Sequence, residues 1–221
     1  MTAAQGRPAS LAGNRPRAGA LCLTMPADPP AGIPQTFTGT WLEAADVALA
    51  RRLARRDAPL VRGLAWASEV GDQGPLFALA GATALAGLLM PNRRIARLGF
   101  EAFAAVLVAS GIKTVLKRTI SRTRPHVLLD EGRYEVRWFG PNEGPWQSFP
   151  SGHTAGPVAA ACALARYDAR LGQAALGATA VMGVVQVLRG AHYPADVIVG
   201  AAVGIASDQL VAGLVSRADR P

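Results

Sequence analysis

The chain has 221 residues, a length that suggests one domain with or without a tail. Half of the residues are hydrophobic and 17% are charged, which excludes a disordered chain. Two cysteines exclude a disulfide scaffold, and three histidines leave little for a multi-histidine metal site, although three ligands would suffice numerically. The net charge of +8 comes mostly from arginine, which suits nucleic acid, an anionic membrane or a phosphorylated substrate.

Residues 1–40 are rich in Ala, Gly and Pro and predict a mobile tail. The apolar stretch 18–25 is too short to cross a bilayer, and it lacks the long apolar core of a signal peptide. Residues 41–70 follow an amphipathic helical pattern with several arginines on the polar face. Two interpretations stay open for this segment: a solvated charged face, or a helix in the headgroup layer with its arginines toward lipid phosphates. Whether it crosses the membrane also stays open.

Five apolar runs follow, and they occupy residues 75–90, 95–115, 152–165, 171–188 and 197–215. A helix needs about 20 residues to cross a hydrocarbon layer of about 30 Å, a length that flanking residues supply to the shorter runs. Gly and Ala are frequent in all five, and small residues let helices approach closely inside a membrane. We therefore predict an all-α polytopic membrane bundle of about five to six helices, embedded as one domain over residues 41–221.

Chain connectivity predicts which segments share a side of the membrane. If each run is a crossing, loop 116–151, loop 189–195 and segment 71–74 lie on one face. The turns 91–94 and 166–170 lie with the C-terminus on the other. The first face holds nearly all the reactive side chains. Ionisable residues are costly in a membrane bundle, so this concentration marks a functional face.

Two segments of that face carry cations and a helix start. Lys117 and Arg124 are seven residues apart, which places them on one face of a helix; a snorkelling basic helix end is the simpler interpretation. Ser151 is a plausible N-cap, and the amides after it, Gly152 included, favour an anion. His153 in that first turn could give a proton to a leaving oxygen, although an ordinary capped helix explains the segment equally well.

The third segment contains a second histidine and an acid. Pro194 suits the first turn of a helix, and Asp196 would lie two residues inside it. From there Asp196 can reach back to orient His192 and support its charge while the other ring nitrogen bonds to phosphorus; a capping Asp beside an unrelated His is the alternative. Phosphoryl transfer needs cations and N–H dipoles around the phosphate, an in-line nucleophile and an acid, and the three segments together contain all of these without invoking a metal.

The three segments resemble the type 2 phosphatidic acid phosphatase superfamily, also called lipid phosphate phosphatases, in a bacterial branch. That family has a Lys, six residues and Arg-Pro; then Pro-Ser-Gly-His; then Ser-Arg, five residues, His, three residues and Asp. Here the first block is Lys117 to Arg124-Pro125, and the second is complete at 150–153. The third has His192 and Asp196 at the right separation.

The third block departs from the family pattern, because Gln186 stands where the family has Arg. We infer that Arg189 supplies the missing charge and that Gln186 donates a neutral hydrogen bond. The resemblance implies that His192 forms a phosphohistidine held by Asp196, and that His153 protonates the departing oxygen and later activates water. It implies phosphate binding by Lys117, Arg124, Ser151 and the Gly152 N–H. It also implies a bundle of about six helices with the site at one membrane border and neither metal nor cofactor.

The positive-inside rule makes the turn side cytoplasmic and the catalytic face periplasmic, as in a bacterial inner membrane, because that side carries Arg93, Arg94, Arg97, Arg166, Arg170, Arg217 and Arg220. Aromatic residues in loop 116–151 suit the headgroup layer and a lipid substrate, either a phosphate monoester or a diphosphate such as a polyprenyl diphosphate. A small transporter or channel and a vanadate-dependent haloperoxidase are the alternatives. No nucleic-acid partner is expected, since the arginines lie between apolar runs and do not cluster on a soluble module. The sequence leaves the oligomeric state open.

Overall fold

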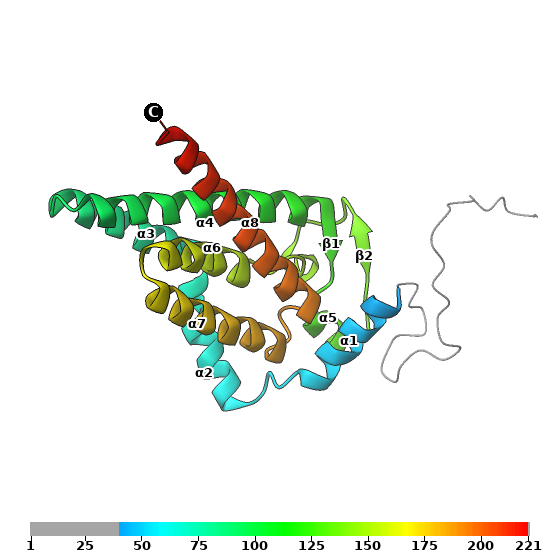
Figure 1. Cartoon of the computed structure of the whole chain (residues 1–221). Helices are drawn as coiled ribbons and strands as arrows, with labels where there is room; N and C mark the ends of the chain where they lie inside the picture. The colour runs from blue at the N-terminus through cyan, green and yellow to red at the C-terminus, as the bar shows by residue number, and fades with distance from the viewer. Residues whose placement is uncertain (1–39, 221) are drawn as a thin grey trace, which may run out of the picture.

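The computed structural model describes residues 40–220 (Figure 1). The predicted tail lies outside this range except for Thr40, which caps the first helix. The described chain is mostly helical, as predicted, and its helices are α1 Trp41–Leu53, α2 Pro59–Ala67, α3 Gln73–Leu89, α4 Arg93–Thr119, α5 Pro125–Glu131, α6 Gly152–Tyr167, α7 Ala169–Leu188 and α8 Pro194–Ala218. Two short 3-10 turns, η1 Ser68–Gly71 and η2 Gly144–Trp146, and two strands complete it.

The five apolar runs form α3, α4, α6, α7 and α8, which confirms the predicted helices. Local signals set their ends: the side chains of Asn92 and Asp168 accept hydrogen bonds from the first amides of α4 and α7, and α8 begins at Pro194. Three of the described helices, α4, α7 and α8, are long and apolar enough to cross a membrane. The chain is thus an integral membrane protein, and α3 is a shorter apolar helix of 17 residues.

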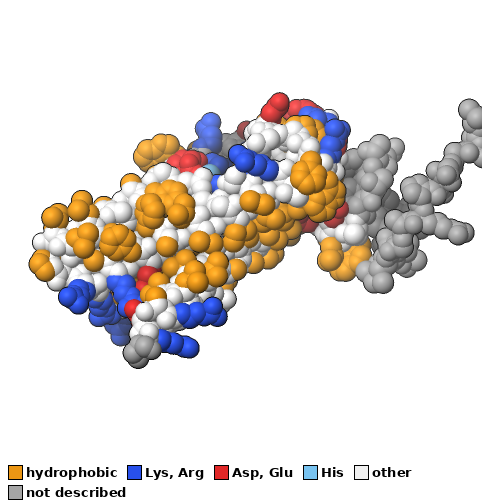
Figure 2. Space-filling model, turned by 90° about the horizontal axis from the view of Figure 1, so that it is seen from above, with side chains coloured by type: hydrophobic (Ala, Val, Ile, Leu, Met, Phe, Trp, Pro, Cys, Tyr) orange, Lys and Arg blue, Asp and Glu red, His pale blue; other side chains and the backbone are white. Residues whose placement is uncertain are grey.

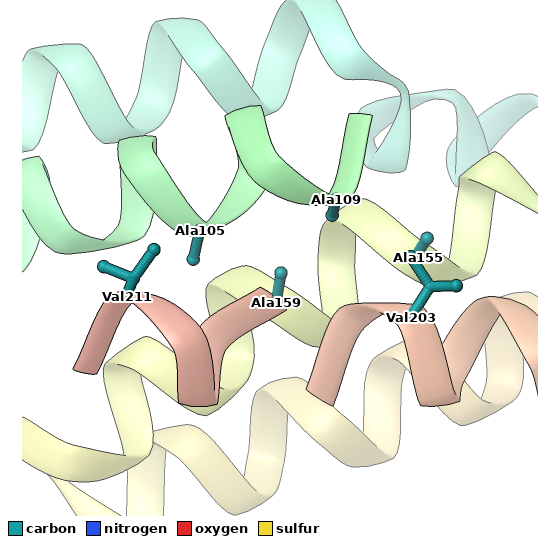
Figure 3. Close-up of a cluster of buried hydrophobic side chains, with 6 residues drawn as sticks. All are labelled: Ala105, Ala109, Ala155, Ala159, Val203 and Val211. Carbon is teal, nitrogen blue, oxygen red and sulfur yellow. The ribbon is translucent and has the colours of Figure 1, made fainter. Parts of the chain in front are cut away.

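Helix α6 lies at the centre of the bundle, packed against α3, α4, α7 and α8. Figure 3 shows where α4, α6 and α8 meet, in a cluster made of Ala105, Ala109, Ala155, Ala159, Val203 and Val211. Four of these six side chains are single methyl groups, which lets the three backbones approach closely. Packing of small side chains therefore holds the bundle together.

The segment 41–70 is two helices and a turn rather than one continuous helix. Helix α1 ends at Leu53, and Pro59 begins α2 after a residue, Ala58, that is extended because a following proline disfavours the helical conformation. The 13 residues of α1 rise only about 20 Å, which is short of the hydrocarbon thickness. The helix buries Val47 and three alanines against the bundle and leaves several leucines exposed.

The two ends of the bundle are different, as chain connectivity predicts (Figure 1). One end gathers α5, the starts of α6 and α8, and an antiparallel pair of strands, β1 Ile120–Arg122 and β2 Val136–Trp138, within loop 116–151. The strand pair was not expected from the sequence. The other end has the α3–α4 and α6–α7 turns and the C-terminus, around which Lys and Arg side chains gather in Figure 2.

An ionic cluster with two buried carboxylates joins helices at the end of the bundle that carries the C-terminus. Arg166 of α6 binds Glu101 of α4, with Nη2 2.7 Å from Oε2, and it also pairs with Asp208 of α8. The Tyr167 hydroxyl donates a further hydrogen bond of 2.9 Å to Glu101. Because each carboxylate faces a cation, the cluster joins three helices without leaving an isolated buried charge.

Candidate active site

Hydrogen bonds join the three sequence blocks at the end of the bundle opposite the C-terminus. Lys117 at the end of α4 donates to the Gln147 carbonyl at 2.6 Å. The Ser151 amide, at the start of α6, donates at 3.0 Å to the carbonyl of Asp196 in the first turn of α8. The structure thus brings together residues that are far apart along the chain.

His192 is held in a defined orientation just before α8. Its ring is 2% exposed, and Nδ1 lies 2.6 Å from the carbonyl oxygen of Ser148. A carbonyl only accepts hydrogen bonds, so Nδ1 carries the hydrogen and Nε2 keeps its lone pair. Burial lowers the pKa of His192 to about 4, and the imidazole is therefore neutral near pH 7.

Asp196 contacts His192 less closely than the sequence suggested. Its Oδ2 lies 3.8 Å from Nδ1, and it instead accepts hydrogen bonds from the Ser148 hydroxyl at 2.6 Å and from the Tyr193 amide at 2.8 Å. This carboxylate also caps α8 in the first turn, which is the alternative that the sequence left open for Asp196. Asp196 therefore organises the loop that carries the carbonyl partner of His192.

Two residues that the sequence did not single out support Asp196. The Arg122 guanidinium donates to Asp196 Oδ1 at 2.7 Å and to Asp46 Oδ2 at 2.8 Å, and it lies 3.9 Å from the centre of the Tyr193 ring. Asp46, on α1, also accepts from the Ala195 amide at 2.8 Å. Arg122 thus turns toward carboxylates rather than toward a substrate phosphate, and α1 is anchored at the site.

The start of α6 presents backbone amides and a lysine. Ser151 occupies the N-cap position, but its hydroxyl accepts from Thr154 at 3.1 Å and does not cap the helix. Lys113, one turn before Lys117 on α4, lies beside Gly152: its Nζ would be 3.7 Å from a Cβ placed there. The sequence placed Lys113 in an apolar run, and only the packing of α4 against α6 brings it to the site.

Arg124 and Arg189 lie close enough to repel each other. Burial lowers the pKa of Arg124, and the positive charge of Arg189 lowers it further. Among residues 40–220, the buried Nε atoms of both arginines and the buried Nε2 of His153 have no hydrogen-bond partner. The unpartnered Nε donors of the two guanidinium groups form a surface suited to an anion such as phosphate.

Glu69 of η1 reaches the site from the chain before α3. Its Oε1 lies 3.1 Å from Arg189 Nη1, and its Oε2 lies 3.5 Å from His153 Nε2. Gln186 is fully buried, and its amide donates to the Ser68 hydroxyl at 3.1 Å, so its NH₂ group supports η1. No spacing in the sequence connects residue 69 with the three blocks. Within the described chain, no group of three or more His, Cys, Asp or Glu side chains is arranged to hold a metal ion.

The family follows from the same residues. The model of the PAP2 superfamily matches residues 98–220, a range that contains all three blocks. The chain belongs to the PAP2 superfamily. The predicted resemblance and the predicted helical bundle are thereby confirmed.

Named relatives and solved structures agree with this membership. The chain is 35% identical to the lipid A 1-phosphatase of Rhizobium etli over 107 residues, which cover 48% of this chain and 46% of that protein. It is 34% identical over 143 residues to the decaprenylphosphoryl-5-phosphoribose phosphatase of Mycobacterium tuberculosis, which cover 65% of this chain and 72% of that protein. The chain thus spans about half the length of the Rhizobium proteins that it matches.

Two solved structures share the fold. Aquifex aeolicus LpxE superposes with a TM-score of 0.58 at 22% identity, covering 76% of this chain and 94% of that one. The transmembrane PAP2 type phosphatidylglycerolphosphate phosphatase from Bacillus subtilis superposes with a TM-score of 0.55 at 19% identity. The superposition covers 83% of this chain and 90% of that one. At these identities the likeness establishes the fold of the membrane bundle.

Proposed function

We propose that this PAP2 protein hydrolyses a lipid-linked phosphate through a phosphohistidine on His192, without a metal. The observation that carries the proposal is the orientation of His192: a buried, neutral imidazole whose Nδ1 hydrogen goes to a carbonyl, which leaves the lone pair on Nε2. A neutral ring nitrogen of fixed orientation is a nucleophile. The cations of the site, among them Arg124, Arg189 and Lys117, can stabilise the negative charge of a phosphate.

In the proposed reaction, His192 Nε2 attacks phosphorus as the bond to the leaving oxygen breaks. His153 gives its proton to that oxygen and then removes a proton from the water that hydrolyses the phosphohistidine. Asp196 keeps the Ser148 carbonyl against Nδ1 and stabilises the positive charge that the ring acquires. Each proton and each bond is thus handled by a side chain of the described site.

The phosphate oxygens would be bound by the free faces of Arg124 and Arg189, by the ammonium groups of Lys113 and Lys117, and by amides at the start of α6. The buried Nε atoms of both arginines support this assignment, because they have no partner in the described chain. Arg189 thereby takes the place of the family arginine that Gln186 replaces. Charge-assisted hydrogen bonds of this kind are roughly twice as strong as neutral ones.

A lipid substrate is supported by the surroundings of the site. Trp138 and Phe139, in the loop beside it, are 72% and 78% exposed, as side chains in a headgroup layer are. The named relatives are phosphatases of lipid A and of decaprenylphosphoryl-5-phosphoribose. Because the matched region covers about half of the former, we assign a class, lipid-linked phosphates, and not one lipid.

Phosphate release tests this proposal. The purified protein is given phosphatidate, phosphatidylglycerophosphate, lipid A and polyprenyl diphosphate, each with and without EDTA. We expect release from at least one lipid, unaffected by chelation, with turnover lowered by orders of magnitude in His192→Asn and His153→Asn. His126→Asn is the matched control, since this third histidine lies on α5 and has no assigned role. Strong inhibition by EDTA, or turnover by His192→Asn near the wild-type rate, would refute the mechanism.

We further propose that the site faces the periplasm of a bacterial inner membrane. The support is the group of arginines in the turns and C-terminal segment at the opposite end of the bundle (Figure 2), since several cations at the site end pair with carboxylates or are assigned to phosphate. A green fluorescent protein fused to the C-terminus should fluoresce, because it folds in the cytoplasm. An alkaline phosphatase fusion at the same position should be inactive, and activity there would reverse the assignment.

A further inference from the structure

Glu69 is the one acidic side chain of the described site that contacts both the proposed acid and a phosphate-binding arginine. Its two oxygens are divided between them: one is 3.1 Å from Arg189 Nη1, and the other is 3.5 Å from His153 Nε2. The side chain is 53% exposed, so it borders the open side of the site rather than its core. A carboxylate is an unexpected neighbour for a substrate that is itself an anion.

The backbone that carries Glu69 is fixed on both sides. Ser68 is 3% exposed and accepts the hydrogen bond from Gln186, while Gly71 is buried. A Cβ at Gly71 would lie 2.0 Å from Cε of Met182 on α7 and 3.2 Å from Cγ of Pro157 on α6. The turn η1 is thus packed directly against α6 and α7. The position of the Glu69 carboxylate is therefore a property of the folded bundle.

The contact between Glu69 and His153 indicates that the leaving group is the part of a substrate that lies beside this carboxylate. A general acid must come within about 3 Å of the leaving oxygen to protonate it. The nitrogen that faces Glu69 is Nε2, so a group leaving beside that nitrogen departs next to the carboxylate. The atoms attached to the leaving oxygen then decide whether Glu69 helps or hinders the reaction.

Monoesters and diphosphates differ at this point. In both, the His192–phosphorus bond forms and the bond between phosphorus and the leaving oxygen breaks. A monoester releases an alcohol, whose oxygen must take the proton of His153, and the negative charge of Glu69 favours that protonated imidazole. A diphosphate releases a phosphate, which is stable as an anion because its second pKa is about 6 and which carries charge that the carboxylate repels.

We propose that Glu69 is a specificity-determining residue that directs this site to lipid phosphate monoesters and against lipid diphosphates. The inference rests on the proposed phosphatase function and narrows its substrate class. Both of its effects favour monoesters: the carboxylate aids protonation of an alcohol leaving group, and it repels a leaving group that is negatively charged. Arg189 keeps Glu69 turned toward the site through their ion pair.

The test compares substrates that differ by one phosphate group. Phosphatidate is paired with diacylglycerol diphosphate, and undecaprenyl phosphate with undecaprenyl diphosphate, in the same detergent micelles. For Glu69→Gln we expect kcat/KM on the monoesters to fall about two- to fivefold, a size typical of one exposed charged contact, while the value on the diphosphates stays level or rises. Glu69→Asp should keep most of the monoester preference. Glu143→Gln, which removes an exposed carboxylate from loop 116–151, should leave the ratio unchanged.

The outcomes separate this inference from the proposed function. An active Glu69→Gln variant with an unchanged ratio, or an equal fall on both substrates of a pair, would overturn the inference alone. A wild type that prefers the diphosphates would overturn it as well. A wild type that releases phosphate from no lipid in either pair or in the wider panel would overturn the proposed function, and this inference with it.

Discussion

Removing the Asp46 carboxylate should detach α1 from the site. Asp46 and Arg122 are 9% and 7% exposed, and their oxygen and nitrogen are 2.8 Å apart. Asp46→Ala leaves one face of the guanidinium and the Ala195 amide without their acceptor. Breaking a buried pair by deleting one partner costs about 3–5 kcal/mol. For a domain of this size that loss lowers the unfolding temperature by roughly 10 °C.

Thermal unfolding in detergent, followed by circular dichroism at 222 nm, measures this shift. The control is Asp130→Ala, which breaks the ion pair with Arg56 that also joins the N-terminal segment to α5. That pair is 49% and 37% exposed, so its loss should leave the midpoint unchanged. Turnover should fall only in Asp46→Ala, because Arg122 also holds Asp196. Equal midpoints for the two variants would refute the reasoning that the buried pair anchors α1.

Acid should destabilise the wild type more than His192→Asn, because the unfolded imidazole takes up a proton as the pH falls through 6.5 whereas the buried one does so only near pH 4. Between pH 7 and pH 5 the free energy of unfolding should fall by about 2 kcal/mol more in the wild type than in His192→Asn. An equal fall in the two proteins would contradict this. Gly172→Leu should yield aggregated protein in size-exclusion chromatography, since a Cβ there would lie 2.3 Å from the α6 backbone; Gly177→Leu, with nothing within 4 Å, should stay monodisperse. Arg189→Ala should raise KM about tenfold, with Arg189→Lys between it and wild type, and unchanged kinetics would remove this residue from the phosphate site.

The helices of the bundle and the three sequence blocks of the candidate site were predictable from local patterns. An apolar run long enough to cross a bilayer is a helix almost regardless of its neighbours, because backbone groups in lipid must be satisfied within the segment. The start of α8 followed from Pro194, which acts within one helical turn. Ser151 marked the N-cap position of α6, but its side chain does not cap the helix. The break between α1 and α2 was missed, although Pro59 was a signal for it.

The partners of the charged side chains could not be inferred in the same way. Asp46 meets Arg122 across 76 positions and Glu69 meets Arg189 across 120, and the charge of a residue does not say which opposite charge it will find. Arg122 and Arg124 are two residues apart in one block, yet one binds buried carboxylates and the other faces the proposed phosphate site. Hydropathy and capping act over a few residues and can be recognised along the chain. The ion pairs that shape this site depend on how α1, η1 and the long loop pack against the bundle, which only the folded protein settles.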